Sequence, residues 1–345
     1  MASKINEEIN QVNDLFNKAG YDTIRCDSIF SRFCFDLLAN KISVENKTAQ
    51  SAYKTLVTKV VTNIDALNPR NLKELKYISY FLNAVPLIIG KNNRRNELEE
   101  SVAYYRQGIT ALSLKTLHNL LKNNESLLYF AKRGSIIARI NGNKIKSQRE
   151  KMSMSRKDLS RKIDVSAKSI ASYERGIMNT NKEHLKKIEE VLEIKIIEPV
   201  KVFDQTPADL EWMNLHDSKP KPRKKNMPFF DEIYEIFEEL EIFQFWTSKS
   251  PFDVLVSIPT EKNNKVIANN TMISAIFPYF DSKEEERLDI IRKILKIARF
   301  YGIVIVNEKI DTSKSKIGGI PVIEKKELKS IKNQKDFKKL VRKKL

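Results

Sequence analysis

The stretch SRKDLSRKIDVSAKSIASYERG, residues 155–176, decides the fold in the middle of this chain. Ser155 and Ser166 are each suited to cap the start of a helix, and Gly176 is suited to end one. Only the tripeptide Asp-Val-Ser that ends at Ser166 separates the two predicted helices, and Val165 within it can tuck beneath them. So short a connection between two short helices predicts a helix-turn-helix.

Apolar residues at helical spacing continue on both sides of this motif. They give four short helices one shared core, which predicts a compact helical domain over residues 140–197. The residues expected in that core are Ile145, Leu159, Ile163, Val165, Ile170, Tyr173, Leu185, Ile188 and Leu192.

From about Asn143 to Glu193 the sequence resembles the helix-turn-helix domains of the Xre/Cro/phage-repressor class. The shared features are the V-S turn, the S-I-x-x-Y-E-R-G helix after it, and an L-x-x-I pattern in the next helix. The resemblance implies an ion pair between Arg149 and Glu174. The chain departs from the class at Asp164, where a glycine is common, although aspartate can adopt the left-handed conformation at modest cost.

In this class the second helix of the motif enters the major groove by its N-terminus, so one face of it meets base edges and phosphates. The small side chains of serine and alanine distinguish little between base pairs by direct contact. Lys168 is therefore expected to supply most of the direct contact, with specificity that is modest or partly based on DNA shape. The residues predicted to bind DNA are Arg156, Ser166, Ala167, Lys168, Ser169, Ser172 and Arg175. The alternative is a four-helix protein-interaction module without DNA binding.

Strands alternating with helices predict an α/β layer before the helical domain, in residues 1–135, and another after it, in residues 229–332. The two layers resemble each other, because the Phe-Asp-Leu-Leu that contains Asp36 matches the Phe-Asp-Val-Leu that contains Asp253, and further apolar strands follow both at nearly constant spacing. A duplication is therefore expected. The strands expected in the first copy are residues 34–39, 55–61 and 85–89.

Both copies resemble the fold of restriction endonucleases and archaeal Holliday-junction resolvases, which hold a divalent metal with an aspartate and the glutamate of an E-x-K pair. Asp36 stands at the aspartate position and Lys59 at the lysine, but Val57 replaces the glutamate. The corresponding residues of the second copy are Asp253, Ile273 and Ala275. One carboxylate is a poor site for Mg²⁺. We therefore expect two degenerate nuclease-like domains that serve dimerisation or DNA shaping, with vestigial positions Asp36, Lys59 and Asp253 and with no catalytic residue, metal or cofactor.

Composition narrows the class of protein further. Lys and Arg number 62 against 44 Asp and Glu, and the formal net charge of +18 attracts polyanions such as DNA and RNA, unless the excess lysine only solubilises the surface. Cys26 and Cys34 form no C-x-x-C pair, so neither a disulfide framework nor a cysteine zinc site is expected. No apolar run reaches membrane-spanning length and the N-terminus lacks a signal-peptide pattern, so a cytoplasmic, nucleoid-associated protein is expected.

Two polar segments complete the organisation. Residues 198–228 are charged and contain prolines, which predicts a linker. Residues 333–345 are rich in Lys and Arg and are expected as a basic C-terminal tail, in the form of a solvated helix rather than an arm that binds DNA.

Over nearly its full length the chain resembles an archaeal family of helix-turn-helix transcriptional regulatory proteins. The shared segments are C-F-D-L-L-A at 34–39, N-I-D-A-L at 63–67, P-L-I-I-G at 86–90, P-F-D-V at 251–254 and G-G-I-P-V-I at 318–323. The resemblance implies a multidomain protein with a central helix-turn-helix between two related α/β domains, which regulates transcription by binding double-stranded DNA, and we expect it to do so as a homodimer. The alternatives are a nuclease or junction-processing enzyme steered by the central domain, and a weakly specific protein that coats DNA.

Overall fold

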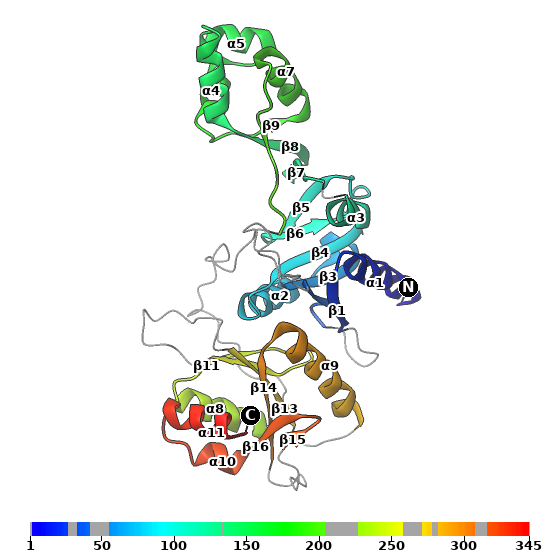
Figure 1. Cartoon of the computed structure of the whole chain (residues 1–345), viewed down its shortest axis with the longest axis vertical. Coiled ribbons are helices and arrows are strands. Elements are labelled where there is room, and N and C mark those ends of the chain that lie inside the picture. Colours follow the sequence, from blue (N-terminus) through cyan, green and yellow to red (C-terminus); the bar gives the residue numbers. More distant parts are fainter. Residues whose placement is uncertain are drawn as a thin grey trace. The chain divides into compact units, whose positions relative to one another are not determined.

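The structure is a computed structural model, and it contains two nuclease-like sheets and one helical domain, as the sequence predicts (Figure 1). The chain divides into two compact units, of which unit 1 comprises residues 1–60, 67–87 and 204–345, and unit 2 comprises residues 61–66 and 88–203. The residues described are 2–26, 33–41, 55–123, 125–132, 134–203, 227–257, 271–277, 282–307 and 316–344.

The first nuclease-like copy comprises six strands of a ten-stranded sheet, in the order β1-β2-β3-β4-β6-β5. The strands are β1 (Tyr21–Arg25), β2 (Leu37–Lys41), β3 (Thr55–Asn63), β4 (Val85–Asn92), β5 (Val102–Arg106) and β6 (Ile109–Leu112). The helices are α1 (Ala2–Lys18), α2 (Pro69–Phe81) and α3 (Leu114–Lys122), with a 3-10 turn η1 (Ile64–Ala66) after β3. Of the three predicted strands, the first begins later than expected, at Leu37, and the other two lie where the apolar runs placed them.

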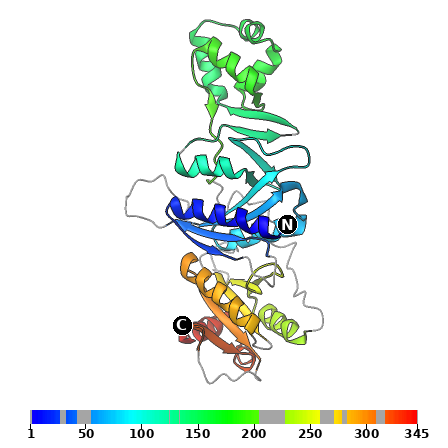
Figure 2. The ribbon, with the colours of Figure 1, turned by 90° about the vertical axis from the view of Figure 1, so that its right-hand side faces the viewer.

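The second copy repeats this order strand for strand, as β11-β12-β13-β14-β16-β15. The strands are β11 (Phe243–Trp246), β12 (Val254–Ser257), β13 (Thr271–Phe277), β14 (Tyr301–Val306), β15 (Lys316–Ile317) and β16 (Ile320–Glu324). Helix α9 (Ser282–Ala298) connects the parallel strands β13 and β14 and lies along one face of the sheet (Figure 2). Helices α8 (Pro228–Glu239), α10 (Lys325–Lys329) and α11 (Gln334–Lys344) lie on the other face.

The duplication extends to individual hydrogen bonds. The backbone N–H of Asp36 donates to the carbonyl of Thr58, and that of Asp253 donates to the carbonyl of Ser274. This register aligns Thr58 with Ser274, and it therefore aligns the neighbours Lys59 and Ala275, the pairing that the sequence predicts.

The last helix corrects one expectation. Residues 333–345 were expected as a basic tail with a solvated helix, but Phe337 and Val341 of α11 are buried in the core of the second copy, with Phe237 among their neighbours. The Lys and Arg residues cover only the outer side of an amphipathic helix. The segment is therefore part of the second α/β domain.

The predicted linker also begins later than expected. Val200 is buried and its N–H donates to the carbonyl of Leu127, so the chain stays packed on unit 2 beyond residue 198. Most of the remaining linker, residues 204–226, lies outside the described residues.

The helical domain belongs to unit 2, and its first helix follows directly after strand β8 (Ser135–Ile140). This strand pairs with β7 (Tyr129–Lys132), β9 (Thr180–Asn181) and β10 (Ile197–Glu198). The helices that follow are α4 (Gly142–Lys151), α5 (Arg156–Ile163), α6 (Ala167–Glu174) and α7 (Lys182–Leu192). Eight of the nine predicted core residues are buried, and Val165 packs against them half-buried.

Candidate nucleic-acid interface

The turn between α5 and α6 has the geometry of a helix-turn-helix. Ser155 begins α5 with a capping box that Asp158 completes, and the Ser166 side chain accepts a hydrogen bond from the N–H of Ser169 at the start of α6. Asp164 ends α5 with φ 60° in the left-handed region, which is the conformation predicted where the class commonly has glycine. Three local signals therefore fix the angle at which the chain enters the second helix.

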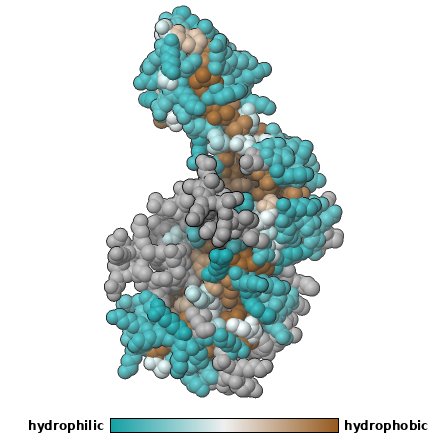
Figure 3. Space-filling view, in the orientation of Figure 1, coloured by the Kyte–Doolittle hydropathy of each residue, from teal (hydrophilic) through white to brown (hydrophobic). Residues whose placement is uncertain are grey.

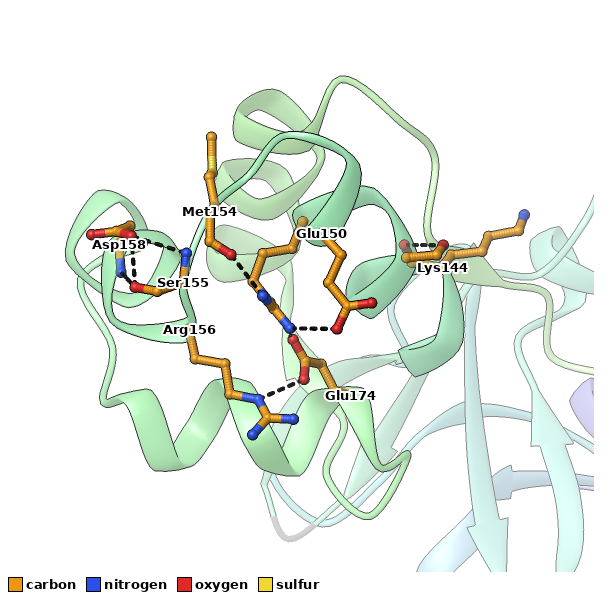
Figure 4. A network of polar contacts seen from close by, with 9 residues as sticks. Lys144, Glu150, Met154, Ser155, Arg156, Asp158 and Glu174 are labelled. Carbon is orange, nitrogen blue, oxygen red and sulfur yellow. Dashed lines mark hydrogen bonds and ion pairs between the residues drawn. The ribbon is translucent and has the colours of Figure 1, made fainter.

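A buried carboxylate joins three helices of the domain (Figure 4). The side chain of Glu174, on α6, is 1% exposed, and its Oε1 lies 2.6 Å from Nε of Arg149 on α4. Its other oxygen, Oε2, lies 2.7 Å from Nε of Arg156 on α5. The ion pair implied for Arg149 and Glu174 is present, and Arg156 adds a second cation that the sequence did not indicate.

The electrostatics of this cluster favour the charged forms. Burial alone would raise the pKa of Glu174, but the hydrogen bonds from Arg149 and Arg156 hold that pKa below its usual range. The pKa of Arg149 is raised, mainly by its hydrogen bond to Glu174. Arg149 also donates to the carbonyl of Met154 at 2.6 Å, so it ties the loop after α4 to α6. Glu174, Arg149 and Arg156 thus form a fully charged cluster, here called the brace, that holds α6 against α4 and α5.

The N-terminal end of α6 faces solvent. Ser166, Ala167 and Lys168 are exposed, and no ion pair engages Lys168 within the described part of the chain. Ser169 and Ser172 are half-buried, and the Ser169 hydroxyl lies 2.9 Å from that of Ser166. The serines are therefore partly occupied with capping, which leaves Lys168 as the extended polar side chain at this end.

Two further cations, Arg156 and Arg175, lie at the other, C-terminal end of α6. Arg156 remains 48% exposed although its Nε is bound to Glu174, so part of its guanidinium is open to a ligand. Arg175, just after α6, is exposed, and its Nε donates to the carbonyl of Ala171. On the face shown in Figure 3 the surface of the helical domain, which is green in Figure 1, is mostly hydrophilic. The predicted residues thus form a cationic surface around α6.

The structure shows two residues of the domain that were not predicted from the sequence, Ile177 and Gly142. Ile177 is 69% exposed and follows Gly176, whose φ of 70° ends α6. Gly142 begins α4 where a Cβ would lie 2.3 Å from the backbone oxygen of Tyr173. The position of Ile177 directly after a helix-ending glycine could have drawn attention to it, because apolar residues at that position usually pack back onto the helix. No local signal could have revealed Gly142, whose neighbour is thirty-one positions away in the sequence.

Asp36 and Asp253, the predicted vestigial residues, hold corresponding positions in the two nuclease-like copies. Asp36 Oδ2 accepts a hydrogen bond from the N–H of Val60 at 2.7 Å, and Asp253 Oδ2 accepts one from the N–H of Ile276 at 2.8 Å. Both aspartates are buried. Val57 and Ile273, which the sequence comparison of the two copies aligns with the E-x-K glutamate, are fully buried apolar residues.

These residues do not fit a divalent cation. Mg²⁺ requires several oxygen ligands in near-octahedral arrangement. The Asp36 carboxylate is already bound to Lys59 and to the N–H of Val60, and the Asp253 carboxylate is bound to Arg287 and to the N–H of Ile276. Among the described residues no group of three or more His, Cys, Asp and Glu side chains could hold a metal ion. In the same part of the chain no helix combines the length and apolar character needed to cross a membrane.

The fold and this surface define a helix-turn-helix protein with an attached nuclease-like domain. Two family profiles agree: residues 145–198 match the helix-turn-helix family, and residues 5–127 match the PD-(D/E)XK superfamily domain. No solved structure matches the chain.

Several archaeal proteins resemble the chain over most of their length, and those below share the name "Putative HTH-type transcriptional regulatory protein". The relative from Thermococcus kodakarensis is 29% identical over 96% of this chain and 94% of its own length. The one from Methanobrevibacter smithii is 28% identical, over 97% and 96%. The one from Methanococcus vannielii is 30% identical, over 81% and 82%. The chain belongs to this archaeal family of HTH-type transcriptional regulatory proteins.

Proposed function

We propose that this protein regulates transcription by placing the N-terminal end of α6 in the major groove of duplex DNA. The observation that carries the proposal is the brace at Glu174, which fixes α6 against α4 and α5 while leaving Lys168 exposed at its leading end. A recognition helix needs both properties, because a groove accepts the helix only at a defined angle and reads it only through accessible side chains.

Each candidate residue has a distinct role in this proposal. Lys168 contacts a base edge or the nearest phosphate, whereas Arg156 contacts a backbone phosphate and Arg175 lies close to the same DNA strand. Ser166, Ala167, Ser169 and Ser172 allow close approach, and the small side chains make the specificity modest or dependent on DNA shape. The positive charge of the whole chain, +18, supplies sequence-independent attraction.

Lys168→Ala is expected to weaken binding to duplex DNA about tenfold, as one direct contact is worth roughly 1–3 kcal/mol. The salt dependence of the affinity should also fall by about one counterion if the contact is to a phosphate. Fluorescence anisotropy at several salt concentrations measures both. The matched control is Lys186→Ala, which removes an exposed lysine from α7, away from the recognition helix. Equal affinities for the two variants would refute the assigned surface.

We propose further that the protein binds as a homodimer, because a single short motif seldom binds tightly and palindromic operators match two-fold protein symmetry. The nuclease-like domains would then serve dimerisation or DNA shaping. Light scattering gives the mass in solution, and footprinting on selected sites gives the half-site spacing, which should be about 10 base pairs or a multiple of it. A monomer that protects a single half-site would exclude this arrangement.

A nuclease or junction-processing enzyme is the second candidate, because residues 5–127 match the PD-(D/E)XK superfamily domain. The apolar Val57 and Ile273 argue against it. Incubation with supercoiled, linear and four-way-junction DNA in Mg²⁺ or Mn²⁺ tests it, and cleavage that Asp36→Ala abolishes would establish it. Similar affinities for many unrelated duplexes would instead favour a protein that coats DNA.

A further inference from the structure

The buried aspartates of the two nuclease-like copies pose one electrostatic problem. Asp36 is 6% exposed and Asp253 is 4% exposed. An ionised carboxylate removed from water costs several kcal/mol unless a cation or several hydrogen bonds compensate it. In an active nuclease of this fold a divalent metal supplies that compensation, but the glutamate needed to hold the metal is absent from both copies.

The first copy supplies a cation from its own sheet. Nζ of Lys59, on β3, lies 2.8 Å from Oδ1 of Asp36. The same ammonium donates to the carbonyl of Phe33 at 2.9 Å, so it lies between the carboxylate and the chain that leads into β2.

The second copy has lost that lysine, since Ala275 occupies the position aligned with Lys59. Its cation comes instead from a helix. Nη2 of Arg287, on α9, lies 2.5 Å from Oδ2 of Asp253, and Nη1 lies 3.0 Å from Glu284. The guanidinium also donates to the carbonyl of Pro251 and lies over the ring of Phe277, 5.5 Å from its centroid.

We propose that Lys59, which stands at the E-x-K lysine position, and Arg287, which lies outside that pattern, are the permanent counter-charges of Asp36 and Asp253, so that both sites are metal-independent structural locks. Two unrelated elements, a strand and a helix, have placed a cation on the same carboxylate. That coincidence is expected if the requirement is a positive charge at this point in the fold. It is not expected if either pair were an incidental surface contact.

Each lock joins segments that the fold must hold together. Through its aspartate, the first connects the start of β2 to Val60 of β3, and the second connects the start of β12 to Ile276 of β13. The second lock also fixes α9 to the sheet through Arg287. A divalent ion should therefore add nothing to the stability of the protein, whereas removal of either cation should weaken the compensation of a buried carboxylate.

The test uses the full-length protein. Arg287→Met is expected to lower the melting temperature by roughly 5–15 °C, because breaking a buried ion pair is strongly destabilising. The matched control is Arg292→Met on the same helix, since Arg292 is 52% exposed and pairs with the exposed Asp289 at 3.3 Å. That variant should melt within about 2 °C of the wild type. The double variant Asp253→Asn/Arg287→Met should regain a large part of the loss, because it buries no net charge.

Metal titration separates a lock from a hidden metal site. MgCl₂ and MnCl₂ are each added at 5 mM, roughly the concentration at which weak sites of this kind fill. Neither salt should raise the melting temperature of the wild type, of Lys59→Met or of Arg287→Met. Electron paramagnetic resonance should show no signal from bound Mn²⁺. Stabilisation or a bound signal that Asp36→Asn or Asp253→Asn removes would overturn the proposal. A melting temperature for Arg287→Met equal to that of Arg292→Met would overturn it too. If Arg287→Met does not fold, Arg287→Lys and the wild-type metal titration decide.

Discussion

Glu174→Ala is expected to destabilise the helix-turn-helix by about 3–5 kcal/mol and to abolish DNA binding at physiological temperature. The variant removes the buried partner of Arg149, whose side chain is only 8% exposed and would keep only the exposed Glu150 as a charged partner. It also releases Arg156, so α4 and α5 both lose their ion pair with α6. Hydrogen exchange of the α6 amides measures the local loss even if the other domains stay folded.

Glu150→Ala is the matched control for that experiment, because Glu150 contacts the same Arg149 at 3.3 Å but is 53% exposed. An exposed pair of this kind contributes about 0–1 kcal/mol, so the control should keep its exchange protection and its affinity. Similar losses in the two variants would show that burial does not set the strength of the brace.

The same carboxylate predicts a pH dependence. The pKa of Glu174 is lowered in the folded protein from its ordinary value of 4.5. A lowered pKa contributes stability that is fully present above the ordinary value and is lost as the pH falls from there through the folded value. The local stability of α6 should therefore be constant from pH 7 to about 5 and decline below pH 4.5. Glu174→Gln should lack this component of the decline, and an unchanged acid profile in that variant would contradict the assignment.

Gly142→Ala is the second substitution with a large expected effect, at about 3 kcal/mol. An added Cβ would lie 2.3 Å from the carbonyl oxygen of Tyr173 and 2.4 Å from that of Glu174. Both are backbone atoms of α6, so no side-chain rotation relieves the contact and α6 itself must move. The melting temperature, measured by thermal denaturation, and the affinity for DNA should fall together.

The sign of this result is diagnostic, because alanine is a better helix former than glycine and helix propensity alone predicts stabilisation. Asn143→Ala is the matched control, since Asn143 is the next residue of α4 and is exposed. It should leave stability unchanged or raise it slightly. If Gly142→Ala also stabilised the protein, the close approach of α4 and α6 would be refuted.

The sequence by itself determined the elements whose signals are local. The caps at Ser155 and Ser166 and the left-handed Asp164 act within a few residues, so the positions of α5 and α6 could be predicted closely. The match between the strands around Asp36 and Asp253 likewise revealed two related sheets, because buried strands keep their apolar pattern and spacing even when the residues of a former site change.

Only the tertiary structure decided which distant residues compensate one another. The sequence predicts a basic tail where Phe337 is buried in a core, and nothing in it indicates that Arg287 pairs with Asp253 or that Gly142 contacts α6. The physical reason is range: a cap or a periodic face is encoded in neighbouring residues, whereas a buried charge or a close backbone approach depends on elements that the chain brings together only when it folds.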